Sequence, residues 1–233
     1  MVLGTEEIFD NLPKASLLKS LPREEAEALL ALGVKRRYEP QELVVYQGDS
    51  GSSMMVVLRG RLRASLFADS GKEILLAYIQ AGDVVGEMAV LDGGPRSASV
   101  TAEEPSDLLV IERSKLTPFL AQHGEVGLSL IVNLCRRMRN ATEMLSEHSN
   151  LGVPQRLARS ILRLAVEMSP QGSEMRLREL KIRQADLGSY TGLARENVNR
   201  QLREWVEAGL IELGRGRLVI KDSKALQQIA DSL

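Results

Sequence analysis

The stretch GDVVGEMAVLDGGPRS, residues 82–97, joins a short apolar strand to a Gly-Glu turn and, nine residues after the glutamate, places an arginine beside a serine. A phosphodiester is best held by a guanidinium fork and a hydroxyl, with backbone N–H groups exposed at a glycine and at the start of a short helix. Gly86, Arg96 and Ser97 supply these groups. The Glu87 carboxylate suits a ribose hydroxyl instead, as acidic residues do in other nucleotide sites. The stretch therefore indicates a cradle for a cyclic phosphate, although a tight turn with Arg96 in a surface ion pair would use the same residues.

The composition sets broad limits. The chain has 233 residues, 44% hydrophobic and 26% charged, which is typical of a soluble protein of one or two domains. No run approaches the ~18 apolar residues of a membrane span. The start, MVLGTEE, carries acid where a signal peptide needs basic charge, so we expect a cytoplasmic protein without membrane contact. One cysteine, Cys135, and two histidines, His123 and His148, predict no metal, no haem and no iron-sulfur cluster.

The net charge differs between the two parts of the chain. Residues 1–150 hold 16 Lys and Arg against 21 Asp and Glu (net −5), and residues 151–233 hold 14 against 10 (net +4), which together give the −1 of the whole chain. Only the second part favours nucleic acid, and the difference is modest.

Short apolar runs separated by turn residues fill the region from residue 36 to 113. They cover residues 43–46, 54–58, 62–66, 74–78, 97–101 and 107–111, with glycines at 48, 60, 71 and 82. This rhythm predicts antiparallel hairpins in a small barrel or jelly roll, a β-roll. Residues 22–32, ahead of it, are helical in composition, with acids in the first turn. A cupin-type enzyme barrel is the alternative, but such enzymes need inward histidine and glutamate ligands, and neither histidine lies in this region.

A long helix is predicted over residues 126–150. Its seam residues are spaced 3, 4, 3, 4 and 3 apart, which is a heptad pattern able to pair two subunits in parallel. They are Leu128, Ile131, Cys135, Met138, Thr142 and Leu145. The same stripe could instead pack on its own β-roll.

A second domain follows the breaker at residues 151–154, since the residue before a proline is disfavoured in a helix. Residues 155–168 predict an amphipathic helix, and residues 169–172 its end. Residues 183–202 then predict two short helices that meet at Gly192, the arrangement of a helix-turn-helix. The second helix should bury the apolar residues Val198, Leu202, Trp205 and Val206.

The outer face of that second helix would carry polar residues able to contact base edges, namely Arg195, Glu196, Asn199 and Arg200. Arginine can hold guanine bidentately, and glutamate can accept from a cytosine amino group. Residues 209–220 predict a hairpin with a Gly-Arg-Gly tip. Such a hairpin would form a wing, from which Arg215 or Arg217 could reach a phosphate.

These motifs, in this order, resemble the catabolite-activator and FNR family of bacterial transcription regulators over residues 15–225. The resemblance implies an α+β fold with three parts: a β-roll cyclic-nucleotide-binding domain at 1–125, a dimerisation helix at 126–150 and a winged helix-turn-helix at 151–233. It implies cyclic AMP or cyclic GMP as the effector. The implied nucleotide-binding residues are Gly86, Glu87, Met88, Arg96, Ser97, Ala98, Arg137 and Thr142.

The resemblance also implies a homodimer that binds palindromic DNA and contacts RNA polymerase. The implied DNA-binding residues are Arg183, Gln184, Arg195, Glu196, Asn197, Asn199 and Arg200. Two positions depart from the family pattern. Ala141 stands where the cyclic-AMP receptors have a threonine, which puts the choice of base in doubt, and Gln201 replaces an apolar residue.

We find no catalytic constellation and expect no enzyme activity. Two alternatives stay open. One is a family member with a different effector, or none, that binds DNA constitutively. The other is a nucleotide-hydrolysing enzyme of β-roll type.

Overall fold

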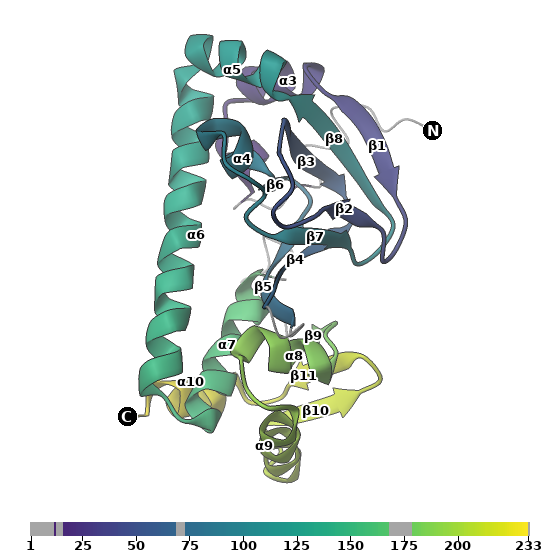
Figure 1. Cartoon of the computed structure of the whole chain (residues 1–233). Coiled ribbons are helices and arrows are strands. Elements are labelled where there is room, and N and C mark those ends of the chain that lie inside the picture. The colour runs from purple at the N-terminus through teal and green to yellow at the C-terminus, as the bar shows by residue number, and fades with distance from the viewer. Residues whose placement is uncertain (1–11, 13–15, 69–72, 168–178, 233) are drawn as a thin grey trace. The chain divides into compact units, whose positions relative to one another are not determined.

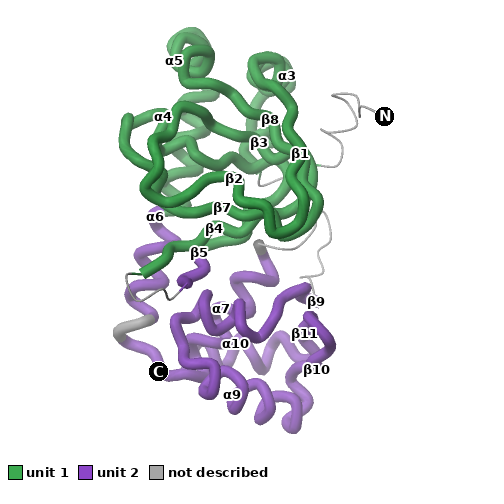
Figure 2. Tube along the Cα trace, turned by 45° about the vertical axis from the view of Figure 1, so that its right-hand side comes forward, with its two compact units in different colours: residues 1–72, 76–137 green, residues 73–75, 138–233 purple. Residues whose placement is uncertain are grey.

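The computed structural model describes residues 12, 16–68, 73–167 and 179–232 (Figure 1). The chain divides into two compact units, residues 1–72 with 76–137 and residues 73–75 with 138–233, coloured separately in Figure 2. The fold is the predicted α+β arrangement of a β-roll, a long helix and a winged helix-turn-helix.

The first unit contains two four-stranded sheets. One has the strand order β1-β8-β3-β6, with β1 at Val34–Tyr38, β8 at Ser106–Glu112, β3 at Ser53–Arg59 and β6 at Val84–Val85. The other has the order β2-β7-β4-β5, with β2 at Leu43–Val45, β7 at Ser99–Ala102, β4 at Arg61–Phe67 and β5 at Glu73–Gln80. The strand pairs β1–β8, β3–β8, β3–β6, β2–β7 and β4–β7 are antiparallel, as the hairpin rhythm predicted.

Two apolar clusters hold this unit together. One joins inward-facing residues of both sheets, among them Tyr38, Met55, Leu62 and Val100. The other packs residues from the sheet containing β3 and β8 against the flanking helices α2 (Leu17–Ser20), α3 (Arg23–Ala31), α5 (Arg113–Gln122) and α6 (Gly124–Asn150). Burial of apolar surface in two connected layers is the main stabilising contribution in a fold of this type.

All six predicted strands overlap strands of the structure, but the sequence pattern missed β1. This strand reads VKRRY, and its first four residues are exposed. It lies at the edge of its sheet, where charged side chains are common because they prevent pairing with other chains. Its composition therefore lacks the apolar alternation that identifies a strand.

Helix α6 covers the predicted long helix and begins two residues earlier. Four residues of its apolar seam are largely exposed in the single chain: Leu128, Ile131, Met138 and Leu145 are 62, 56, 67 and 71% exposed. The division into compact units falls inside this helix, so the domain boundaries at residues 125 and 150 stay a prediction.

The second unit contains helices α7 (Val153–Glu167), α8 (Gln184–Thr191), α9 (Arg195–Glu207) and α10 (Ser223–Asp231). A three-stranded sheet of order β10-β11-β9 completes it, with β10 at Ile211–Gly214, β11 at Arg217–Ile220 and β9 at Glu179–Leu180. The predicted helix end at 169–172 lies outside the described residues.

Gly192 ends α8 with a φ of 66°, the left-handed conformation predicted for the turn between the two helices. Helix α9 buries Val198, Leu202 and Trp205, also as predicted. The prediction for Val206 is wrong, because it is 41% exposed. Val206 follows Trp205 directly, and adjacent residues on a helix point about 100° apart.

Candidate nucleotide-binding and DNA-binding sites

The turn at Gly86 brings the two ends of the 82–97 stretch together. Gly86 has a φ of 79° and precedes α4 (Glu87–Asp92), a short helix that Gly93 ends in the same left-handed conformation. A Cβ atom on Gly86 would lie 2.1 Å from Arg96 Nη1. Glycine is therefore required here both for the backbone conformation and for the approach of the arginine.

Arg96 is buried and held by backbone. Its Nη1 donates to the carbonyl oxygens of Ser53 (2.8 Å) and Gly86 (2.9 Å), and its Nη2 donates to Ser53 Oγ (3.3 Å). These bonds use three of the five guanidinium N–H groups. Among the described residues, none accepts from Nε–H or from the second Nη2–H. That edge is the one with which arginine binds a phosphate or carboxylate bidentately.

The surroundings of Arg96 suit an anion. Burial lowers the pKa of the guanidinium, while Glu87, Asp49 and Glu112 oppose this shift. Arginine stays charged in proteins, so a positive charge is held with incomplete hydrogen bonding. Ser97 beside it is exposed, and its hydroxyl donates only a weak bond to Met88 Sδ (3.5 Å). Both groups are available to a ligand phosphate, and Ala98 after them is half-buried and directly precedes β7.

Glu87 is paired with the long helix. Its side chain is 3% exposed, and Oε1 accepts from Arg137 Nη1 at 2.9 Å. Arg137 Nη2 also donates to the Val84 carbonyl oxygen at 2.6 Å. The second carboxylate oxygen, Oε2, is buried and has no partner among the described residues. A buried acceptor of this kind is costly unless a donor reaches it, and a ligand hydroxyl would be such a donor. Figure 1 shows α4 beside α6, where this contact forms.

A second carboxylate belongs to the same region. Burial raises the pKa of Asp83, while Arg137 and Arg136 oppose the shift. The sequence reasoning did not single out Asp83, because nothing in the local pattern distinguishes it from a turn residue.

Thr142 lies further along α6, in the second unit. Its hydroxyl is exposed and donates back to the Met138 carbonyl oxygen at 3.0 Å, which satisfies the polar group at this seam position. The structure brings Gly86, Glu87, Met88, Arg96, Ser97 and Arg137 together. The role of Thr142 stays a prediction, because it belongs to the other compact unit.

Within the second unit, α6 is joined to the helix-turn-helix through α7. Glu147 on the last turns of α6 is buried and accepts from Arg163 of α7. The Glu147 charge also acts on Arg156, one of whose nitrogens donates to the Thr191 carbonyl oxygen at 2.6 Å. Burial lowers the pKa of Arg156, and Glu147 opposes this shift. Two half-buried arginines of α7 thus contact the neighbouring helices, Arg163 at Glu147 of α6 and Arg156 at the last residue of α8.

The recognition face on α9 is solvent-exposed at its first two residues, Arg195 and Glu196. Asn197 accepts from Arg200 Nη2 at 3.2 Å, which orients that guanidinium along the helix. Asn199 is partly buried, and its Oδ1 has no partner among the described residues. The exposed cations and amides leave α9 able to form hydrogen bonds to base edges.

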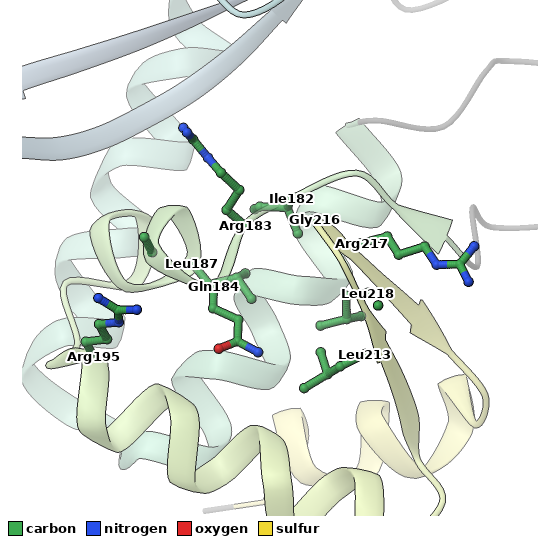
Figure 3. Close-up of a pocket in the computed structure, with 11 residues that line it drawn as sticks. Ile182, Arg183, Gln184, Leu187, Arg195, Leu213, Gly216, Arg217 and Leu218 are labelled. Atoms are coloured by element: carbon green, nitrogen blue, oxygen red, sulfur yellow. The ribbon is translucent and has the colours of Figure 1, made fainter.

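A hollow of about 270 Å³ lies between the first turns of α8 and α9 and the β10–β11 hairpin (Figure 3). Arg183, Gln184, Arg195 and Arg217 are among its lining residues. Arg183 is also bound to Asp186 through Nε and Nη2 (2.8 and 3.2 Å), and Arg217 lies 3.7 Å from Glu179. Cations around a hollow at helix starts are well placed for backbone phosphates.

Comparisons with known proteins agree with this picture. Residues 35–123 match the cyclic nucleotide-binding domain family, and residues 155–229 match the Crp-like helix-turn-helix domain family. The chain is 31% identical to the cyclic AMP receptor protein of Thermus thermophilus over 218 residues, which cover 93% of this chain and 97% of the relative. It is 28% identical to a CRP-like cAMP-activated global transcriptional regulator of Mycobacterium tuberculosis, over 80% of this chain and 84% of that one.

Solved structures show the same fold. The crystal structure of the Thermus thermophilus catabolite activator protein matches 92% of this chain and 97% of its own, with a TM-score of 0.53 and 31% identity. The c-di-GMP responsive global regulator CLP of Xanthomonas campestris matches 86% of this chain and 100% of its own, with a TM-score of 0.75 but 22% identity. The chain therefore belongs to the CRP/FNR family and is a cyclic-nucleotide-binding transcription regulator.

This membership removes the enzymatic alternatives, because the relatives are transcription regulators. A nucleotide-hydrolysing β-roll and a cupin-type barrel are both excluded as descriptions of this chain. Within the described residues, no helix has the length and apolar character needed to cross a bilayer.

Proposed function

We propose that the protein binds cyclic AMP or cyclic GMP at residues 82–97 of the first unit, hereafter the cassette, and, as a homodimer, binds a palindromic DNA site. The observation that carries the proposal is the pair of incomplete groups at the cassette. Among the described residues, none accepts from one N–H edge of Arg96, and none donates to the buried Oε2 of Glu87. One group requires an anion and the other a hydroxyl, and a ribose cyclic phosphate carries both.

The cyclic phosphate would lie between Arg96 and Ser97, and its ribose 2′-hydroxyl would donate to Glu87. Arg137 would keep Glu87 oriented through the 2.9 Å contact. Met88 and Ala98 would line the site. The relatives in Thermus thermophilus and Mycobacterium tuberculosis are named for cyclic AMP. The base preference of this chain is open between adenine and guanine, because Ala141 lacks the hydroxyl of the family pattern.

The dimer would form through the seam of α6. Leu128, Ile131, Met138 and Leu145 are largely exposed in the single chain. Apolar residues at this heptad spacing are stabilised when a second helix covers them. Thr142 belongs to the same seam, and in the dimer its hydroxyl would also reach the base of a bound nucleotide.

The DNA site would be two inverted half-sites. A two-fold dimer places its recognition helices in major-groove segments about 34 Å apart. Arg195, Glu196 and Arg200 would contact base edges, with Asn197 and Asn199 beside them, and by the family resemblance the half-site would resemble TGTGA. Arg183 and Gln184, and Arg217 on the wing, would contact phosphates. As a regulator acting on DNA in the cytoplasm, the dimer would also contact RNA polymerase.

Isothermal titration calorimetry with cyclic AMP, cyclic GMP and cyclic di-GMP tests the effector. Wild type should bind cyclic AMP or cyclic GMP with one site per chain, and Arg96→Leu should abolish the signal at the same concentrations. Arg36→Leu, at an exposed arginine on β1, is the matched control and should titrate like wild type. Binding of cyclic di-GMP alone would favour a family member with a different effector. If none of the three nucleotides binds, and the DNA affinity is the same with and without them, the result would favour a constitutive regulator.

A further inference from the structure

Arg113 is bonded both to α4, which carries Glu87, and to the residue before β3, but it is not part of the cassette. Its Nε donates to the Val90 carbonyl oxygen at 2.8 Å, and its Nη2 donates to the Ala89 carbonyl oxygen at 2.6 Å. These are the carbonyls of the third and fourth residues of α4, which are among its last four, and the first residue of α4 is Glu87. A cation that bonds to the last carbonyls of a helix also compensates the negative end of its dipole.

The backbone of Arg113 makes the bond to the residue before β3. Its N–H donates to the Ser52 carbonyl oxygen at 2.7 Å. Ser53, the next residue, supplies the carbonyl and hydroxyl oxygens that accept from Arg96. One residue is therefore bonded both to the helix that carries Glu87 and to the strand start that orients Arg96.

The position of Arg113 in its own helix is unfavourable. It is the first residue of α5, and the first turn of α5 has no acidic residue. A cation at a helix N-terminus opposes the dipole of that helix. The contacts to α4 and to Ser52 offset this cost, so the residue is suited to joining these elements rather than to starting α5.

We propose that Arg113 is a positioning residue for cyclic-nucleotide binding. It fixes α4 against β3, and so sets the separation between the Glu87 oxygen that accepts the ribose hydroxyl and the Arg96 edge that holds the phosphate. It touches no ligand itself. The proposal rests on the proposed function, since it concerns the same site.

The test compares cyclic AMP and cyclic GMP with their 2′-deoxy analogues, by calorimetry on the full chain. Wild type should prefer the nucleotide with the 2′-hydroxyl, because only that one donates to Glu87. Arg113→Met keeps the aliphatic stem and removes every donor. It should weaken binding of the preferred nucleotide at least tenfold and bring the two affinities closer together, because Glu87 is no longer held at the ribose.

Arg113→Gln, which keeps an amide donor, should have affinities between those of wild type and Arg113→Met. It serves as the test if the methionine variant does not fold. Arg36→Met is the matched control and should retain the wild-type preference. A purely structural role would weaken both nucleotides by the same factor, and that result overturns the inference, as does a variant with wild-type affinities. If wild type binds neither cyclic nucleotide, the proposed function fails first, and the positioning role falls with it.

Discussion

The contact between Glu87 and Arg137 allows a quantitative prediction. Arg137→Met would leave the Glu87 carboxylate buried at 3% exposure without its cation. Breaking a fully buried ion pair from one side costs about 3–5 kcal/mol of unfolding free energy. Because the Arg137 side chain is 36% exposed, water screens part of its charge, and we expect a smaller cost, about 2–3 kcal/mol. Glu87→Gln should cost less, about 1 kcal/mol, since it leaves no buried charge behind.

Urea unfolding of the ligand-free protein, followed by far-ultraviolet circular dichroism, measures these costs. The only tryptophan, Trp205, lies in the second unit, so its fluorescence reports that unit separately and should barely change. In the double variant the losses should overlap by about 1.5 kcal/mol or more, because both substitutions remove one interaction and glutamine also removes the charge that Arg137→Met leaves buried. Losses that add within about 0.5 kcal/mol would refute the pairing of these two side chains.

Four further predictions concern other parts of the chain. Asp83→Asn should stabilise the protein at pH 7, and the advantage of the variant should shrink toward pH 4. Because the pKa of Asp83 is raised, the stability that its protonation contributes is present at low pH and is lost as pH rises through the folded pKa. Equal melting temperatures of wild type and variant at pH 7 would contradict this. Glu147→Gln should lower the unfolding free energy reported by tryptophan fluorescence by about 2 kcal/mol, and an unchanged urea midpoint would argue against a buried pair with Arg163. Arg195→Ala should lose about 1–3 kcal/mol of DNA affinity and relax the preference at one base pair. Arg183→Ala should instead weaken binding to all sequences alike and reduce the slope of log affinity against log salt concentration by about one. Selection of bound sites from random duplexes distinguishes the two variants, and undiminished preference in Arg195→Ala would refute the proposed docking. Thr142→Ala should reduce the ratio of DNA affinities with and without nucleotide more than it weakens dimerisation, and an unchanged ratio would count against a role in coupling.

The sequence predicted the elements whose cause is local. The turn at Gly86 and the turn at Gly192 both need a left-handed residue, and glycine marks such positions directly. The long helix was predicted from a seven-residue apolar repeat, a pattern that indicates a helix whether or not a partner helix is present.

The missed features depend on tertiary contacts. Ser53 and Arg113 hold the cassette through bonds to residues about 40 and 24 positions away in the chain, and no local pattern signals them. The one clue at Arg113 was a cation at the start of a helix without acid in its first turn, an electrostatic conflict that tertiary bonds resolve. Strand β1 was missed because an edge strand need not bury alternate residues.

The most direct test of the account is the effect of nucleotide on DNA binding. Fluorescence anisotropy would follow a labelled duplex carrying two inverted TGTGA half-sites, titrated with the protein in the absence and presence of cyclic AMP or cyclic GMP. The account predicts two chains per duplex and a higher affinity with one of these nucleotides, an increase that Arg96→Leu abolishes and Arg36→Leu preserves. The same affinity with and without either nucleotide, or one chain per duplex, would contradict it.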